Sequence, residues 1–285
     1  AGLRLNPRTN GPSRAPYATG ISLKSIADWQ GQPAGGQERR VTGLPEGARF
    51  TTFDWSPDSA RFAFLATRET GVELWCVEAS DARARALTGP SVNAASGIPY
   101  AWLPSSDALI VRLVPGTRGM APDASGLPDG PVVQENLGRK APARTYTNLL
   151  KNSSDETLFE HIMTAQAYRV ALAGTQTPIG PTGMLVRAEP SPDGNFVLAE
   201  TLTRPFSYVV PLSRFPRRVE VWDASGKVVK VLAEIGLKDE VPIAFGAVPT
   251  GPRSHMWRED APATVCWAEA QDQGDPAVEA EVRDR

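Results

Sequence analysis

The stretch Thr52-Phe53-Asp54-Trp55-Ser56-Pro57-Asp58-Ser59-Ala60-Arg61-Phe62-Ala63-Phe64-Leu65 decides the fold of this chain, and its pattern returns between Arg187 and Leu198 as Arg-Ala-Glu-Pro-Ser-Pro-Asp-Gly-Asn-Phe-Val-Leu. In each copy an extended run leads into Ser-Pro-Asp and a second extended run leaves it. Proline fixes φ near the value that a type I turn needs, and aspartate bonds its own backbone there. Gly194 accepts a positive φ without strain. Each copy therefore predicts a β-hairpin.

A second, outer hairpin follows each copy. Val72-Glu73-Leu74-Trp75 leads through a turn to 82–87, and Val219-Glu220-Val221-Trp222 leads to 227–232. Four consecutive strands repeated with degenerate spacing are typical of a propeller blade. No capped stretch of helical period persists beyond about ten residues. The sequence predicts an all-β fold, a β-propeller in which this chain forms a partial ring of about four to five four-stranded blades.

The repeat divides the chain into approximate blades. We expect partial blades over 1–44 and 250–285 and fuller ones over 45–90, 97–182 and 185–248, with residues 278–282 as a third strand of the last blade. A long loop is expected over 115–154 because this stretch is rich in Gly and Pro and shows no periodicity, and 155–162 is expected to be a short helical or extended bridge. Six tryptophans recur at strand positions and are expected to pack between blades: Trp55, Trp75, Trp102, Trp222, Trp257 and Trp267.

Composition argues against several classes of function. The net charge is −2, with 30 basic and 32 acidic residues interspersed, which is not the basic footprint of a duplex-binding protein. No run of eighteen apolar residues predicts a membrane span. The two cysteines, Cys76 and Cys266, lie in unrelated apolar strands, and we expect them to be free thiols. No zinc spacing is present, and no metal or other cofactor is expected.

No catalytic residue is predicted within this chain. The sequence contains no Gly-x-Ser-x-Gly elbow, no His-Glu-x-x-His, no P-loop and no Gly-x-Gly-x-x-Gly. The only histidines, His161 and His255, are too few for a metal cluster, and we interpret both as packed or surface residues. Without a strained elbow to expose a serine, there is no recognisable triad, and whether the chain belongs to an enzyme stays open at this point.

One departure from the repeat marks a candidate binding segment. From Ser56 to Val72 is 16 positions, whereas from Ser191 to Val219 is 28, so the later copy carries an insertion between its second and third strands. Loops at this place emerge on the same face of a propeller as the connections between blades. The insertion combines arginines, aromatics and prolines, and arginine binds carboxylates bidentately. Arg204, Tyr208 and Arg214 are the predicted substrate-binding residues.

The same segment has a purely structural interpretation. Arg217 and Arg218 would then lie at a solvated strand entry, and Phe206 and Phe215 would pack against the blade. Interleaved arginine and aromatic residues also occur in proteins that bind single-stranded nucleic acid, but the acidic balance of the chain disfavours that alternative.

Beyond these patterns, the chain resembles the N-terminal β-propeller region of the prolyl oligopeptidase family of serine peptidases, and most of all its glutamyl endopeptidase-type branch. The resemblance extends over most of the chain and is most specific in its last third. It rests on Ala1-Gly2-Leu3-Arg4-Leu5-Asn6-Pro7, on Arg204-Pro205-Phe206-Ser207-Tyr208 through Arg214-Phe215-Pro216 to Trp222, on Asp239-Glu240-Val241-Pro242-Ile243, and on the stretches Trp257–Ala263 and Trp267–Asp272. Departures are Ser59 where glycine is usual and Gln273 in a stretch that commonly reads Asp-Gly-Gly-Asp.

The resemblance implies a bipartite peptidase in which a propeller is joined to an α/β-hydrolase domain that carries the catalytic triad. That catalytic domain is expected to be absent from these 285 residues. The chain would then be a non-catalytic portion that gates and helps bind a peptide substrate, with the hydrolase domain of the same parent protein and the peptide as partners, and with neither nucleic acid nor membrane. The alternative is a β-propeller protein-interaction module with no peptidase attached.

Overall fold

A computed structural model describes residues 2–24, 38–122, 146–239 and 246–285. Parts of three expected features therefore lie outside the described residues: the partial blade over 1–44, most of the 115–154 loop, and the Glu240–Ile243 stretch. The chain divides into two compact units. One comprises Leu5–Val114 with Ala167–Pro178, and the other comprises Ala1–Arg4, Pro115–Gln166 and Ile179–Arg285. We call them the 5–114 unit and the 179–285 unit.

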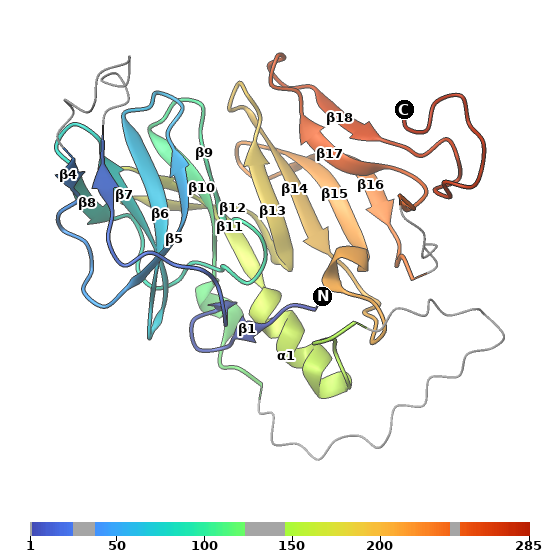
Figure 1. Cartoon of the computed structure of the whole chain (residues 1–285), viewed down its shortest axis with the longest axis horizontal. Helices are drawn as coiled ribbons and strands as arrows, with labels where there is room; N and C mark the ends of the chain where they lie inside the picture. The colour runs from blue at the N-terminus through green and yellow to red at the C-terminus, as the bar shows by residue number, and fades with distance from the viewer. Residues whose placement is uncertain (1, 25–37, 123–145, 240–245) are drawn as a thin grey trace. The chain divides into compact units, whose positions relative to one another are not determined.

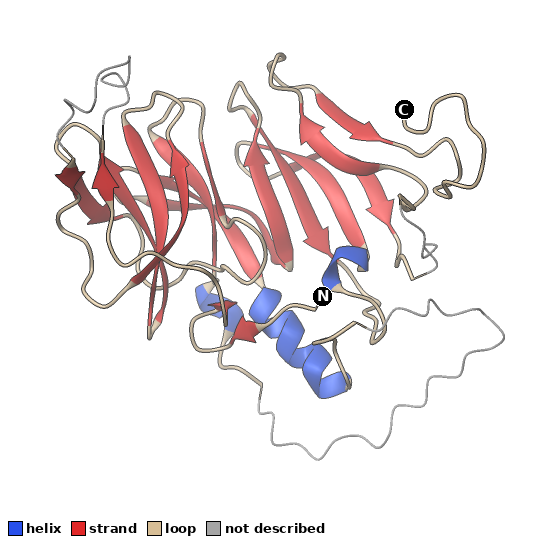
Figure 2. Ribbon diagram, in the orientation of Figure 1, coloured by secondary structure: helices blue, strands red, loops and turns tan. Residues whose placement is uncertain are grey.

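Antiparallel sheets with neighbouring strands in chain order are the main regular structure (Figures 1 and 2). Three sheets have four strands each. The first contains β5 (Arg49–Trp55), β6 (Arg61–Arg68), β7 (Gly71–Glu78) and β8 (Arg83–Ala86). The second contains β9 (Tyr100–Trp102), β10 (Ala108–Leu113), β11 (Ala165–Ala171) and β12 (Gln176–Gly183), and the third contains β13 (Leu185–Pro190), β14 (Phe196–Leu202), β15 (Arg217–Asp223) and β16 (Val228–Ile235).

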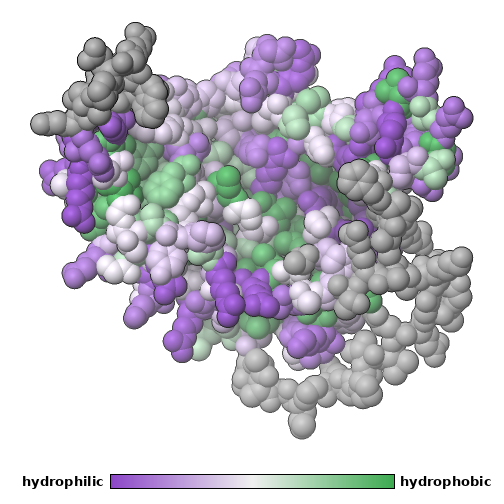
Figure 3. Space-filling model, in the orientation of Figure 1, coloured by the Kyte–Doolittle hydropathy of each residue, from purple (hydrophilic) through white to green (hydrophobic). Residues whose placement is uncertain are grey.

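Shorter pairs complete the described strands: β1 (Leu5–Asn6) with β2 (Gly11–Pro12), β3 (Ser22–Leu23) with β4 (Arg39–Arg40), and β17 (Arg253–Trp257) with β18 (Val265–Ala268). The repeated four-stranded meander confirms the predicted all-β propeller fold. On the face drawn in Figure 3, hydrophilic and apolar residues are interspersed. No helix in the described ranges is long and apolar enough to cross a membrane.

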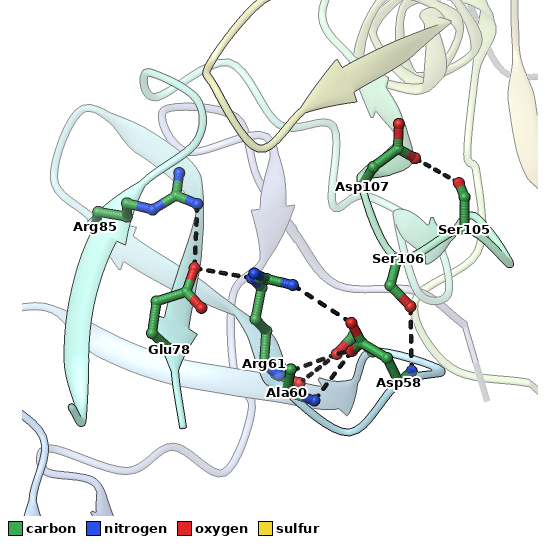
Figure 4. Close-up of polar contacts among 9 residues, drawn as sticks. Asp58, Ala60, Arg61, Glu78, Arg85, Ser105, Ser106 and Asp107 are labelled. Atoms are coloured by element: carbon green, nitrogen blue, oxygen red, sulfur yellow. Dashed lines mark hydrogen bonds and ion pairs between the residues drawn. The ribbon is translucent and has the colours of Figure 1, made fainter. Parts of the chain in front are cut away.

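The predicted Ser-Pro-Asp turns are tight and similar to one another. The Ser56 hydroxyl donates to Asp58 Oδ1 at 2.6 Å, and the Ser191 hydroxyl donates to Asp193 Oδ1 at 2.5 Å. Each serine Oγ also accepts an N–H from the strand that leaves the turn. In the first copy, Arg61 lies between the carboxylates of Asp58 and Glu78, as Figure 4 shows. The serine and aspartate side chains thus form hydrogen bonds with backbone groups that would otherwise have no partner in the turn.

Within each unit, the first strand of one sheet is fastened to the first strand of the next in the same way. In the 5–114 unit, Trp102 Nε1 donates to the Asp54 carbonyl at 3.2 Å. In the 179–285 unit, Trp257 Nε1 donates to the Glu189 carbonyl at 3.1 Å. Both acceptors lie two residues before the serine of a Ser-Pro-Asp turn. The packing role predicted for tryptophan is confirmed at these two positions.

Two other expectations are wrong. Residues 278–282 form no strand, although Ala270 and Asp284 make an isolated bridge, because the alternating pattern there finds no partner strand among the described residues. Trp55 is 51% exposed and packs on Phe62 of its own sheet, so it does not fill a space between sheets. Cys76 and Cys266 are both free, as expected, and the first is fully buried.

Candidate functional site

The predicted insertion is a 14-residue loop, 203–216, between β14 and β15. The equivalent connection in the first sheet is the tight turn from Arg68 to Gly71. The loop contains one turn of 3-10 helix, η3 (Leu212–Arg214), which Pro211 precedes directly and Pro216 follows after Phe215. It lies against helix α1 (Ser153–Met163), which belongs to the same unit. The insertion is thus an ordered element with its own packing partner.

Arg204 binds two carboxylates of this helix. Its Nη1 lies 2.7 Å from Glu156 Oε2, and its Nη2 lies 2.7 Å from Glu160 Oε2. The guanidinium also stacks over the Phe206 ring, 4.6 Å from the ring centre. The hydrogen bonds to Glu160 and Glu156 raise the pKa of Arg204. The forked donors that were predicted to bind a substrate carboxylate are therefore bound to carboxylates of the chain itself.

Tyr208 joins the same group of contacts. Its hydroxyl donates to Glu156 Oε1 at 2.7 Å, and this bond raises the pKa of the phenol. Glu156 thereby accepts from Arg204 on one oxygen and from Tyr208 on the other. Arg204 and Tyr208, two of the predicted site residues, therefore both bind Glu156, a residue that was not predicted to belong to the site.

An aromatic cluster lies beside these polar contacts. Phe206 and Phe215 stack with ring centres 5.6 Å apart, and Phe159 of α1 meets both rings edge-on at 5.2 and 5.8 Å. The two loop phenylalanines are buried, and the packing partner that the structure shows for both is Phe159 of helix α1.

The backbone of Arg214, the last residue of η3, forms two hydrogen bonds. Its N–H donates to the Pro211 carbonyl at 2.9 Å, and its own carbonyl accepts the Lys238 N–H at 3.0 Å. Its Nη1 atom is buried and has no hydrogen-bond partner in the described part of the chain. A buried guanidinium N–H without an acceptor is unfavourable, so a ligand oxygen placed there would be bound favourably.

The neighbouring arginines are used structurally. Glu200 of β14 accepts Arg187 Nη1 at 3.0 Å on one oxygen and Arg217 Nη1 at 3.3 Å on the other. Arg218 pairs with Glu220 at 2.9 Å. Both residues lie at the start of β15, as the structural interpretation expected, but only Arg218 is exposed there, because Arg217 is partly buried against Glu200.

Helix α1 places the carboxylates of Glu156 and Glu160 beside the loop. The Asn152 side chain caps the helix by accepting the Asp155 N–H at 2.8 Å. Positions 156, 159 and 160 then share one face, since side chains three and four apart lie together on a helix. The helical alternative predicted for 155–162 is correct. The four-residue spacing of Glu156 and Glu160 indicates that both carboxylates lie on one face of a helix, but neither residue was predicted to belong to the site.

Both histidines have a lowered pKa. Burial lowers the pKa of His255, which stacks on Trp267 with ring centres 5.9 Å apart. Burial, and to a lesser extent the positive charge of nearby Arg118, lowers the pKa of His161. Within the described ranges, no three His, Cys, Asp or Glu side chains are grouped so that they would hold a metal ion.

The whole chain is similar to two curated proteins. The "Probable glutamyl endopeptidase, chloroplastic" of Oryza sativa subsp. japonica is 34% identical over the full chain, and the protein of the same name from Arabidopsis thaliana is 32% identical. The chain spans only 31% and 30% of their lengths. An acylaminoacyl peptidase structure from Pyrococcus horikoshii aligns with a TM-score of 0.40 at 11% identity, over 70% of this chain and 26% of that one. No family model matches.

The repeated sheets and their first-strand tryptophan contacts define a β-propeller region. Over its whole length, the chain is similar to one part, about a third, of proteins called probable glutamyl endopeptidases. The resemblance to the glutamyl endopeptidase-type branch that the sequence indicated is thus confirmed.

Proposed function

We propose that this chain is the non-catalytic propeller portion of a serine peptidase, and that it gates and helps bind peptide substrate for an α/β-hydrolase domain of the same parent protein. The observation that carries the proposal is the full-length similarity to probable glutamyl endopeptidases that are about three times longer. The remaining length of such a protein would supply the nucleophile, for which no motif exists in these residues.

The 203–216 loop is the proposed contact with substrate. Arg214 is the better candidate for direct binding of a substrate carboxylate, because its Nη1 has no acceptor in the described part of the chain. Arg204 and Tyr208 are bound to Glu156, so in the resting state they hold the loop on α1. We assign Arg204 and Tyr208 the role of positioning the loop. An acidic substrate would compete with Glu156 for these two side chains.

The first experiment compares this chain with the full-length gene product on a fluorogenic peptide containing glutamate. The 285-residue chain should show no turnover, and the full-length protein should cleave the peptide in a reaction that a serine-directed inhibitor abolishes. Inhibitor-sensitive turnover by the chain alone would overturn the division of labour. A stable partner protein without any hydrolase would favour the interaction module.

The second experiment measures kcat/KM of the full-length protein on matched Glu and Gln peptides. Arg214→Ala should lower the Glu/Gln preference about 10- to 100-fold, the range for a lost charge-assisted hydrogen bond. Arg204→Ala should lower it by less than about 10-fold. Arg218→Ala, which removes an exposed arginine paired with Glu220, is the control and should leave the preference unchanged. An unchanged preference in all three variants would end the assignment of the loop to substrate.

A further inference from the structure

The 5–114 unit contains a cavity that the proposed function does not use. Its volume is about 470 Å³, within the range of small-ligand pockets. It lies where the segment 12–17 passes the first strand, β5, and the neighbouring strand, β6. Among its lining side chains are Arg14, Tyr17, Arg49, Thr51 and Thr67. With Val72 of β7, Ala94 and Gly97 also in its lining, the cavity is built from five stretches of one compact unit.

The lining is positively charged. It includes Arg14 and Arg49 but no Asp or Glu, although the whole chain carries a net charge of −2. Both arginines are exposed, and neither forms an ion pair within the ranges that the structure describes. The Arg49 guanidinium lies over the Tyr17 ring, 5.1 Å from its centre, which orients the fork while leaving its N–H groups free to donate. Hydroxyls of Thr51 and Thr67 add neutral donors.

The backbone beside the cavity is held in an unusual conformation. Thr52 has a φ of 55°, which a β-branched residue rarely adopts, and the β5–β6 register shifts between Thr51 and Asp54. The Tyr100 hydroxyl binds the Thr52 carbonyl at 2.5 Å and so helps to hold this bulge. Strained backbone fixed by its surroundings is concentrated at ligand sites, because it preorganises the groups that bind.

We propose that this cavity binds a carboxylate group of a peptide, with Arg14 and Arg49 as its charge partners and Thr51 and Thr67 as further donors. Forked guanidinium donors match the two oxygens of a carboxylate. Leu65, Val72 and the Tyr17 ring offer apolar contact to the methylene groups beside it. The site belongs to a different unit from the 203–216 loop and does not depend on the proposed function.

The test is direct binding to the intact chain, measured by calorimetry at low salt. Three acetylated pentapeptides serve as probes: one with a central Glu and an amidated end, its Gln counterpart, and the Gln peptide with a free C-terminus. Inorganic phosphate is a fourth probe. Arg14→Met and Arg49→Met should each weaken carboxylate binding about 10-fold or more. Arg8→Met is the matched control, since Arg8 is exposed in the same unit and does not line the cavity.

Tighter binding of the Glu peptide than of the amidated Gln peptide would identify a side-chain carboxylate as the ligand. Tighter binding of the peptide with a free end would identify a terminal carboxylate. Either result supports the proposal if it is lost in Arg14→Met and Arg49→Met and kept in Arg8→Met. Equal binding of all three peptides, binding of phosphate alone, or equal losses in all three variants would overturn it. Thermal melts establish that each variant is folded.

Discussion

Ser59 occupies a turn position with a positive φ, at which glycine is the more favourable residue. It has a φ of 58°, and the equivalent turn residues Gly194 and Ser106 have φ values of 74° and 58°. Each of the three N–H groups donates to the residue three positions earlier, so the turns are alike. The two serines differ in use, because Ser106 Oγ accepts the Asp58 N–H whereas the exposed Ser59 side chain has no hydrogen bond in the described residues.

Replacing Ser59 by glycine should therefore stabilise the chain by about 0.5–1 kcal/mol, since relief of left-handed strain outweighs the added freedom of the unfolded chain. Urea denaturation monitored by tryptophan fluorescence measures the change. Ser106→Gly is the control. It should give no gain, because it removes the acceptor for the Asp58 N–H, and a gain of similar size in both variants would contradict this account.

At the scale of elements, the 203–216 loop and helix α1 stabilise each other through one polar and one aromatic group of contacts. The polar group is partly exposed, with Arg204 at 50% and Glu156 at 18% side-chain exposure. Exposed ion pairs contribute little. The aromatic packing of Phe159, Phe206 and Phe215 therefore contributes most of the stability, and the ion pairs fix the position of the loop.

A double-mutant cycle with Glu156→Gln and Arg204→Gln should give a coupling energy of about 0.5–1 kcal/mol, reduced in high salt. Phe215→Ala should cost more, about 3 kcal/mol, because a buried ring is lost. Chemical denaturation gives both values. Hydrogen exchange in 203–216 should rise in the Glu156→Gln variant and stay unchanged in Glu234→Gln, whose carboxylate is exposed on β16. A coupling energy indistinguishable from zero would mean that the ion pairs do not position the loop.

At the scale of the whole molecule, the same tryptophan contact recurs in each compact unit. Trp102→Phe and Trp257→Phe each remove one N–H donor from a first-strand carbonyl. Each should cost about 0.5–1.5 kcal/mol, the usual net value of a hydrogen bond. Hydrogen exchange followed by mass spectrometry should place the loss of protection in β5 and β9 for the first variant and in β13 and β17 for the second. Uniform loss over both units in either variant would show that the contact is not local.

Local chemistry determined much of this protein, and nonlocal contacts determined the rest. The Ser-Pro-Asp turns, the two-residue alternation and the repeat of four strands are short-range signals, so the sequence alone predicted the propeller and the unusual length of the 203–216 loop. The partners of Arg204 and Tyr208 were not predictable, because Glu156 and Glu160 are more than forty residues away along the chain. The guanidinium of an arginine can donate to any suitably placed carboxylate, and only the tertiary structure places one there.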